Sequence, residues 1–198
     1  MFSLIAGTTN QHKIHEIRQI LNLDGLIISS LSDFENFPDV DENGLTFQEN
    51  AAIKARAYFK YFRKPVFADD SGLVVPALKG EPGIYSARYS GPDASYESNN
   101  QLLIEKIRQI PEKDRIAQFV CAICYKDKDS EFFFTGTTDG IILDQLTGEE
   151  GFGYDPLFYI PELQKTFAQL NTDEKNRISH RGNAIGRLKE FLIKNMNL

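Results

Sequence analysis

The sequence predicts an α/β fold in which helices flank a mixed β-sheet, and three observations support this prediction. Short apolar runs alternate with segments of helical periodicity in the first half of the chain, as in sheets with parallel strands. Later, two apolar runs flank a short polar turn, which is the pattern of a β-hairpin with antiparallel strands. The 198 residues are 41% hydrophobic and contain no repeat or long linker, so we expect one domain that spans residues 1–198.

The first elements alternate strand and helix. Residues 3–6 form an apolar run that ends at Gly7. Asn10, a residue type that favours the N-cap position, then precedes apolar residues at helical spacing. Residues 26–30 have the character of a second strand, and the acidic segment 33–43 has no periodicity. We therefore expect a strand, a helix, a second strand and then an acidic loop.

A capping box marks the start of the next helix. Thr46 is its expected N-cap, and Glu49, three residues later, is expected to accept a hydrogen bond from the N-cap amide. Apolar residues at helical spacing extend this helix over about residues 47–62. Residues 66–68 then predict a short buried strand, which two aspartates follow directly. Polar side chains are therefore expected where that strand ends.

The second half of the chain adds further strands and two helices. Periodicity and turn signals predict, in order, a strand at 73–78, a helix at 94–110, hairpin strands at 116–125 and 131–135, strands at 140–143 and 157–160, and a last helix capped by Ser179. Because a hairpin follows the alternating strands and helices, we expect both parallel and antiparallel pairs in one sheet.

Charge and composition argue against several classes of function. A net charge of -6 disfavours binding to a nucleic-acid polymer, because such proteins neutralise phosphates with a basic surface. No apolar stretch approaches the roughly 18 residues of a membrane helix, and the N-terminal residues lack the pattern of a signal peptide. We therefore expect a soluble, cytoplasmic protein whose partner is neither a membrane nor a nucleic-acid polymer.

The two cysteines form a CxxC pattern, which in other settings indicates a redox or metal site. Cys121 and Cys124 lie in a predicted strand, where residues three apart point to opposite faces of the sheet. The pattern therefore favours two core side chains over a shared site.

Four carboxylates are candidates for a magnesium site. Asp69 and Asp70 follow a predicted strand, and Asp41 and Glu42 lie in the acidic loop. Magnesium is commonly bound by one or two carboxylates together with water and substrate phosphates. The alternative is that these residues form turns or solvated surface charge, and the pattern alone leaves both interpretations open.

The polar segment between the first strand and the first helix is a candidate phosphate site, because backbone N–H groups and the helix dipole favour an anion there. It does not match the P-loop motif, which needs a second glycine and a Ser or Thr after the lysine. The alternative is an ordinary asparagine-capped helix with a solvated lysine. The candidate residues are Thr8, Thr9, Asn10, Gln11, His12 and Lys13.

Two later segments are candidates for binding other parts of a ligand. His180 and Arg181 lie at the start of the last helix, where positive charge opposes the helix dipole unless an anion compensates it. Residues 151–156 combine glycines, aromatic rings and an aspartate, and they suit a flat heterocycle because base–aromatic stacking contributes roughly 1–3 kcal/mol. A solvated helix start and a β-turn with buried aromatic rings are the respective alternatives.

Taken together, these segments resemble the inosine triphosphatase family, also called the Ham1-like noncanonical purine NTP pyrophosphatases. The resemblance runs from Thr8 to about Ala184. Each motif alone is weak, but six in the same order are specific. The motifs are Thr8-Thr9-Asn10 with Lys13 and Glu16, Gly44-Leu45-Thr46-Phe47 with Glu49-Asn50-Ala51 and Lys54-Ala55, residues 68–73 (ADDSGL), residues 82–91 (PGIYSARYSG), residues 151–156 (GFGYDP), and Glu174-Lys175 with residues 179–182 (SHRG).

The resemblance implies a reaction and the residues that carry it. The expected reaction is magnesium-dependent hydrolysis of ITP, dITP and XTP to the monophosphate and pyrophosphate, in a central cleft, with water attacking the α-phosphorus. Asp70 is implied both as the group that activates the water and as a magnesium ligand, and Lys54 as a residue beside the reacting phosphate. Asp41 is implied as a second magnesium ligand, although glutamate is common there in the family, and Glu42 is the alternative.

The resemblance also implies a homodimer and divides the substrate between two sets of residues. Ser71 joins residues 8–13 in holding the triphosphate. Thr9 stands where the family usually has glycine, and because a β-branched residue disfavours positive φ, we expect an ordinary backbone conformation there. The residues implied to enclose the base and sugar are Phe152, Gly153, Tyr154, Asp155, Lys175, His180 and Arg181.

The expected base preference depends on hydrogen-bond donors. Inosine and xanthosine present a 6-oxo acceptor where adenine presents a donor, and Lys175 and Arg181 are the expected partners of that acceptor. One alternative function is a Maf-like pyrophosphatase for modified pyrimidine nucleotides. The other is a nucleotide-binding module without catalysis.

Overall fold

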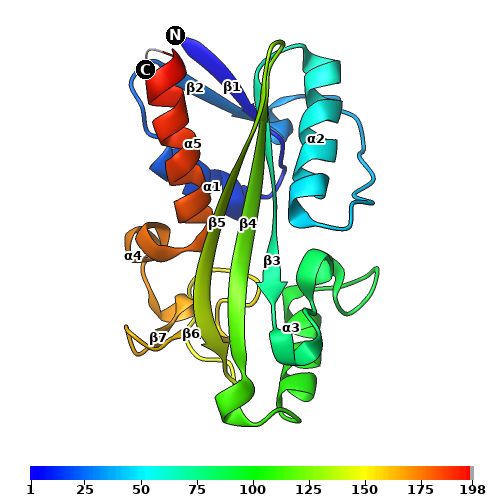
Figure 1. The fold of residues 1–198 in the computed structure, drawn as a ribbon, viewed down its shortest axis with the longest axis vertical. Helices are drawn as coiled ribbons and strands as arrows, with labels where there is room; N and C mark the ends of the chain where they lie inside the picture. The colour runs from blue at the N-terminus through cyan, green and yellow to red at the C-terminus, as the bar shows by residue number, and fades with distance from the viewer. Residues whose placement is uncertain (197–198) are drawn as a thin grey trace. The chain divides into compact units, whose positions relative to one another are not determined.

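The computed structural model describes residues 1–196, in which strands and helices alternate in the first half of the chain and successive strands, then two helices, make up the second half (Figure 1). No helix in this range is long and apolar enough to cross a membrane. The α-helices are α1 (Gln11–Ile20), α2 (Phe47–Phe62), α3 (Tyr96–Ile107), α4 (Thr172–Ile178) and α5 (His180–Met196). The strands are β1 (Phe2–Ala6), β2 (Leu26–Ser30), β3 (Val66–Val74), β4 (Ile116–Lys126), β5 (Glu131–Ile142), β6 (Phe158–Ile160) and β7 (Lys165–Thr166).

The strands of the described residues form one seven-stranded sheet in the order β2-β1-β3-β4-β5-β6-β7. β1 pairs in parallel with β2 and β3, whereas β6 pairs antiparallel with β5 and β7. A tight turn, in which the Asp127 N–H donates to the Ser130 carbonyl, joins β4 to its neighbour β5. The prediction of an α/β fold with a mixed sheet flanked by helices is therefore confirmed.

The chain groups into two compact units, which we describe separately. Unit 1 contains Met1–Asp70, Cys121–Gly136 and the residues from Arg181 onward. Unit 2 contains Ser71–Val120 and Thr137–His180. The expectations of a single domain over residues 1–198 and of a central cleft stay predictions.

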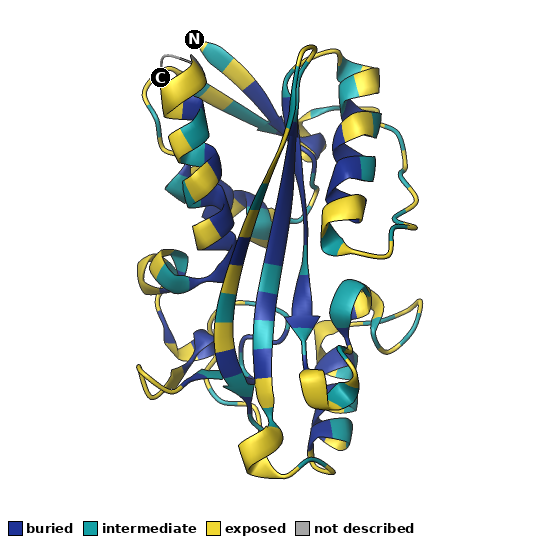
Figure 2. Ribbon diagram, in the orientation of Figure 1, coloured by how far each residue is buried: buried dark blue, intermediate teal, exposed yellow. Residues whose placement is uncertain are grey.

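In unit 1, helices pack on both faces of the strands (Figure 1). On one face, Leu4 and Phe67 belong to a cluster with the apolar residues of α1 and α5. On the other face, Ile5 and Val66 pack with Tyr58 of α2. Neighbouring strand residues join different clusters because successive side chains point to opposite faces. The helices accordingly bury one side and expose the other (Figure 2).

The two cysteines are free thiols in this core. Cys121 belongs to the cluster with α1 and α5, and Cys124 to the cluster with the alanines of α2. They therefore point to opposite faces, and the interpretation of the CxxC pattern as core packing is confirmed. Burial raises the pKa of both thiols to about 12, so both are protonated at neutral pH.

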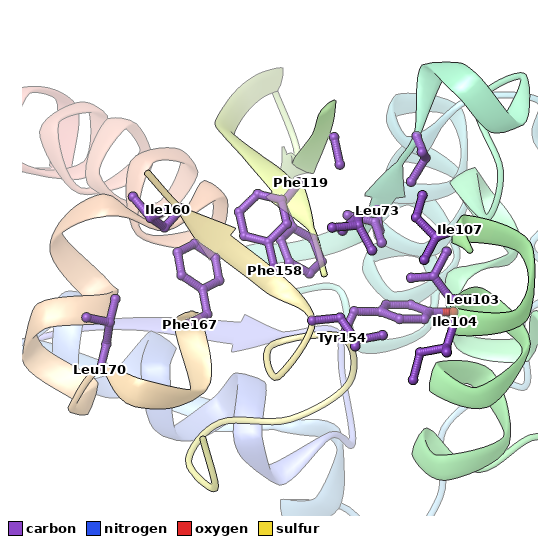
Figure 3. Close-up of a cluster of buried hydrophobic side chains, with 14 residues drawn as sticks. Leu73, Leu103, Ile104, Ile107, Phe119, Tyr154, Phe158, Ile160, Phe167 and Leu170 are labelled. Carbon is purple, nitrogen blue, oxygen red and sulfur yellow. The ribbon is translucent and has the colours of Figure 1, made fainter. Parts of the chain in front are cut away.

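Unit 2 has a hydrophobic core of its own (Figure 3). Its centre is a trio of aromatic rings, Phe119, Phe158 and Phe167, whose centroids lie 4.5 to 5.8 Å apart. Leu103 of α3 and Tyr154 belong to the same cluster. This core therefore holds α3 and the segment that precedes β6 in one packed body.

Strand β3 is longer than the sequence predicted. The prediction of two separate strands, at 66–68 and 73–78, is wrong, because β3 continues unbroken over Val66–Val74. Charged residues normally interrupt a buried strand, but Asp69 and Asp70 both find charged or amide partners in the folded chain. Both aspartates therefore lie within the strand rather than in a loop after it.

The remaining elements follow the predicted order with a few differences. β5 joins the strands expected at 131–135 and 140–143 into one. α4 and β7, of 7 and 2 residues, escaped prediction because such short segments show no measurable periodicity. Ser179 separates α4 from α5, which begins at His180 as expected. The carboxylate of Glu49 accepts from the Leu45 N–H at 2.6 Å, not from the N-cap amide that the capping box implied.

Candidate functional site

The candidate site of unit 1 is built on two adjacent aspartates of β3. Because successive strand residues point to opposite faces, Asp69 faces the same side as Phe67, toward α1 and α5. Asp70 faces the same side as Ala68, toward α2. The two carboxylates are 3% and 9% exposed, so each has its own buried environment.

Asp69 is the centre of a buried network of charges. Its Oδ2 lies 2.9 Å from the Lys13 ammonium on α1 and 3.8 Å from Nε of Arg181 on α5. Arg181 also donates to Glu16 of α1 at 2.7 Å. Burial by itself would raise the pKa of Asp69, but the charges of Lys13, Arg181 and Lys54 outweigh it and hold that pKa well below its usual range. Asp69 is therefore a permanently ionised anchor for both helices.

Asp70 has a different environment. Its Oδ2 accepts from the Asn50 side-chain amide at 3.0 Å, and its Oδ1 lies 3.8 Å from the Lys54 ammonium. Burial raises the pKa of Asp70 above its ordinary value, and the charge of Lys54 and the Asn50 hydrogen bond offset this only in part. A carboxylate with a raised pKa is a better proton acceptor than an ordinary aspartate.

Lys54 forms ion pairs with carboxylates from both segments that the sequence suggested for magnesium, the acidic loop and β3. Its ammonium lies 2.6 Å from Glu42 of the acidic loop as well as near Asp70. Burial would lower the pKa of Lys54, but the negative charges of Asp70, Asp69 and Glu42 raise it overall. The lysine is therefore a fixed cation, and it is unsuited to act as a base at neutral pH.

The structure treats Asp41 and Glu42 differently. Asp41 is exposed, and its backbone carbonyl accepts from the Asn43 N–H. Glu42 is half-buried and turns its carboxylate toward Lys54. The assignment of Asp41 as a metal ligand stays a prediction, whereas the geometry brings Glu42 into the same group as Asp70.

The donors present fit a magnesium ion that arrives with a phosphate. Within residues 1–196, no three His, Cys, Asp or Glu side chains are grouped as a ready-made metal site. Asp70 and Glu42 supply hard carboxylate oxygens near one point, at Lys54. Magnesium usually takes one or two carboxylates and completes its octahedron with water and substrate phosphate oxygens. The site therefore suits an ion that is shared with a bound anion.

The polar loop after β1 is an asparagine cap. Asn10 Oδ1 accepts from the N–H groups of His12 at 3.0 Å and Lys13 at 3.2 Å. Thr8 Oγ1 in turn accepts from the Asn10 N–H. These two amides are thus paired with the cap, as in the alternative of an asparagine-capped helix, but Lys13 is ion-paired with Asp69 rather than solvated, and anion binding by this segment stays a prediction. Gln11, Thr9 and His12 are exposed side chains at the same helix start.

Backbone geometry explains how this loop reaches the site. A Cβ atom at Gly7 would lie 2.8 Å from the Tyr58 ring and 3.0 Å from the Ala68 side chain, so only glycine permits this approach. The residues with positive φ in the described chain do not include Thr9. The expectation that Thr9 has an ordinary backbone conformation is confirmed. Ser71 follows Asp70 in β3 and is half-buried.

In unit 2, residues 151–155 form a tight loop around one carboxylate. Asp155 Oδ2 accepts from the Phe152 N–H at 2.8 Å and from the Lys175 ammonium at 2.6 Å. Both charged residues are buried, with Asp155 3% and Lys175 4% exposed. Gly151 has φ of 77°, and a Cβ atom there would lie 2.2 Å from Asp155 Oδ2. The loop therefore needs glycine where it wraps around the carboxylate.

Aromatic rings complete this part of unit 2. The Lys175 ammonium lies 4.6 Å from the centroid of the Phe152 ring, within the range of a cation–π contact. The Tyr154 hydroxyl donates to the Ser86 carbonyl at 2.8 Å. His180 stacks on Phe119, with centroids 4.5 Å apart and planes within 9°. The loop thus presents a rigid ring beside a fixed cation, an arrangement that suits a flat, polar heterocycle.

The structure brings the predicted residues into two groups. Asp70, Lys54 and Lys13 belong to unit 1 together with residues 8–12, and Arg181 lies there too, in the network of Asp69. The residues of unit 2 are Ser71, Phe152, Gly153, Tyr154, Asp155, Lys175 and His180. Arg181 was expected beside the base together with Lys175; it forms ion pairs with the carboxylates of Glu16 and Asp69, and its contact with the base stays a prediction.

Sequence reasoning assigned no role to Asn50 and Glu16, two polar residues that hold the site. Asn50 and Lys54 are four residues apart on α2, so both reach the same carboxylate of Asp70. Lys13 and Glu16 are three apart on α1, which places both on the buried face toward the Asp69 network. Polar residues at helical spacing on an otherwise apolar face were the signal that could have identified them.

Comparisons with known proteins agree along the length of the chain. A sequence model of the Ham1 family matches residues 4–191. The dITP/XTP pyrophosphatase of an Exiguobacterium species is 48% identical over 191 residues, which cover 96% of both chains. The protein of that name from Clostridium perfringens is 45% identical over 199 residues, covering 97% of this chain and 98% of the relative.

Solved structures agree with the sequence relatives. The Ham1 protein of Staphylococcus aureus is 46% identical and has a TM-score of 0.88, with 97% of this chain and 98% of that chain covered. A HAM1 protein from Coxiella burnetii is 36% identical and has a TM-score of 0.90, with 98% of this chain and 100% of that chain covered. Because sequence and fold agree over nearly the whole length, the chain belongs to the Ham1 family.

Proposed function

We propose that this protein hydrolyses the triphosphates of inosine, deoxyinosine and xanthosine to the nucleoside monophosphate and pyrophosphate, and so removes these nucleotides from the cellular pool. Relatives with 45% and 48% identity over nearly the whole chain carry the name dITP/XTP pyrophosphatase. The single observation that carries the proposal is the position of Asp70. This buried carboxylate is held by Asn50 and lies beside a fixed lysine, as a group that activates water must be.

The proposed chemistry assigns a distinct task to each residue around Asp70. The Asp70 carboxylate orients a water molecule and accepts its proton as the water attacks the α-phosphorus. The Asn50 amide fixes the rotamer of that carboxylate, and the Lys54 ammonium stabilises negative charge on the phosphate oxygens. Magnesium, bound by Asp70 and Glu42 together with the triphosphate, would supply further stabilisation of that charge. The α–β anhydride bond breaks, and pyrophosphate leaves.

The remaining residues would bind and orient the substrate. Lys13 and the exposed polar residues of the loop after β1 offer positive charge and hydrogen-bond donors for the distal phosphates, with Ser71 beside the reacting end. Phe152 offers a ring face for the base, and Lys175 offers a donor for a 6-oxo group. Adenine would leave that buried donor opposite another donor, which disfavours ATP.

Assembly and location extend the proposal. The family resemblance supports a homodimer in the cytoplasm, where a free nucleotide pool is available. Light scattering on the purified protein would measure the mass of the particle, and twice the chain mass of 22.5 kDa is expected.

The products of the reaction test the proposed function directly. We expect magnesium-dependent release of pyrophosphate from ITP and XTP, much slower hydrolysis of ATP, and little of dUTP. Chromatography of the nucleotide products with an enzymatic pyrophosphate assay measures this. Orthophosphate as the first product, or tight binding of ITP without turnover, would contradict the proposal, and a preference for a modified pyrimidine nucleotide would indicate a Maf-like activity.

Adjacent substitutions separate the roles of the two aspartates. Asp70→Asn is expected to fold with near-normal stability, because the amide still accepts from Asn50, and to lose turnover by about 10²–10⁴-fold. Asp69→Asn is expected to lower the free energy of unfolding by roughly 3–5 kcal/mol, because it leaves Lys13 and Arg181 buried without their shared anion. Denaturant titration and steady-state kinetics on both variants provide the measurement. Near-normal turnover in Asp70→Asn would remove that residue from its role.

Metal titration distinguishes the two acidic-loop carboxylates. Removal of divalent ions is expected to abolish hydrolysis, and added magnesium to restore it. Glu42→Gln is expected to raise the magnesium concentration for half-maximal activity by about tenfold or more, because it removes a charged oxygen ligand. Asp41→Asn is the matched control, with an expected change below about twofold because its side chain is exposed. A large shift in magnesium dependence for Asp41→Asn with a small one for Glu42→Gln would identify Asp41 as the magnesium ligand.

A further inference from the structure

One buried amide interrupts the apolar face of α3. Leu103, Ile104 and Ile107 on this face belong to the core of unit 2, and Figure 3 draws them around Tyr154. Asn100 precedes them at helical spacing and is only 6% exposed. A buried amide costs desolvation free energy that an apolar residue at the same place would not. The stability of the core therefore does not explain why an asparagine occupies position 100.

The contact that Asn100 makes is with the loop around Asp155. Its Nδ2 donates to the Gly153 carbonyl at 2.9 Å. Its Oδ1 is buried and accepts no hydrogen bond from the residues that the structure describes. The orientation of the amide is unambiguous, because only the NH2 end can pair with a carbonyl. Within the described residues, the Asn100 side chain therefore makes one hydrogen bond, to the Gly153 carbonyl.

That bond connects the loop to α3, from which the Tyr96 ring also contacts Phe152, with centroids 6.2 Å apart. On one side of the loop, the Asp155 carboxylate accepts hydrogen bonds from the Phe152 N–H and the Lys175 ammonium. On the other side, a cavity of about 550 Å³ adjoins Phe152 and Gly153, and Asn100 is among its lining residues. Gly153 has φ of 63°, a conformation available to glycine at little cost, so the backbone does not hold itself in place. Asn100 therefore provides a hydrogen bond that holds the Gly153 backbone against α3.

We infer that Asn100 is a positioning residue for nucleobase recognition. By holding the Gly153 carbonyl, it fixes residues 151–155 so that the Phe152 ring and the Lys175 ammonium meet the base in one arrangement. It touches no reacting atom and acts only through the loop. This inference rests on the proposed function, in which that loop binds the base of the substrate.

The neighbouring residue offers a matched control. Asn99 has the same side chain on the same helix and is 3% exposed. Its amide, however, binds a different segment, donating to the Ala87 carbonyl at 3.1 Å and accepting from the Ser90 N–H at 2.8 Å. Asn99→Leu therefore removes a buried amide of equal size without removing the bond to Gly153. Glu105→Gln, at an exposed position on the same helix that does not line the cavity, controls for surface effects.

The test combines hydrogen exchange with kinetics on the full-length protein. Asn100→Leu is close in size to the wild type and is expected to retain the melting temperature within a few degrees, because it replaces a buried amide with an apolar group. Amide exchange at residues 152–155 should accelerate. The KM for ITP should rise about tenfold, with kcat changed by less than about threefold and inhibition by pyrophosphate unchanged.

Two more variants show whether the donor itself is responsible. Asn100→Asp preserves shape but removes the NH2 donor, and it should raise KM at least as much as Asn100→Leu. Asn100→Gln retains an amide donor and should recover part of the affinity. Asn99→Leu should accelerate exchange at residues 86–90 and lower the melting temperature, with a smaller change in the KM for ITP. Glu105→Gln should match the wild type.

The outcomes separate this inference from the proposed function. Unchanged exchange at residues 152–155 in Asn100→Leu would overturn the inference without reference to any substrate. A fall in melting temperature with kcat reduced and KM unchanged would also overturn it, because that pattern reports a purely structural side chain. If the wild-type protein fails to hydrolyse ITP while the loop is loosened in Asn100→Leu, the proposed function falls, and with it the role of Asn100 in base recognition.

Discussion

The site depends on the geometry of one strand, which sends two adjacent carboxylates to opposite faces of the sheet. Asp69 turns toward α1 and α5, and Asp70 turns toward α2. If β3 slipped by one residue, the two would exchange environments. The parallel pairing of β3 with β1 fixes this register, with Ile5 opposite Val66 and Ala6 opposite Phe67. The register of a buried strand thereby decides which carboxylate is an anchor and which is available for chemistry.

The two environments have different energetic consequences. Around Asp69, the positive charges of Lys13 and Arg181 offset the cost of burying an ion, and their effect keeps its pKa well below the usual range. This network connects the first helix, the central strand and the start of the last helix. Around Asp70, the balance is reversed, since burial exceeds the effect of Lys54 and raises the pKa. The same residue type is thus a structural ion at one position and, at the next, a carboxylate with the raised pKa that suits its proposed role as a proton acceptor.

Unit 2 uses a comparable arrangement for a different purpose. Asp155 is buried with Lys175, as Asp69 is with Lys13, but here the ion pair shapes a loop instead of joining helices. A loop built from glycines has little conformational preference of its own, so its geometry has to come from its contacts. The Asp155 carboxylate provides a contact to the Phe152 N–H, and the Asn100 amide provides one to the Gly153 carbonyl.

The sequence indicated the fold and most of the site through local patterns. The boundaries of α2 and β2 follow from capping, periodicity and turn residues, which act within a few positions. The continuity of β3 could not be predicted, because it depends on Lys13, Asn50 and Arg181, which come from distant parts of the chain. The same limit applies to Arg181, whose place beside Glu16 is set by a contact between the first and last helices.

In the proposed reaction, water held at Asp70 attacks the α-phosphorus of the substrate. Hydrolysis of ITP in water enriched in oxygen-18 tests it most directly, because the label enters the fragment whose phosphorus is attacked. Mass spectrometry of the two products should find the label in inosine monophosphate and none in pyrophosphate. Label in pyrophosphate would show attack at the β-phosphorus and would contradict the account.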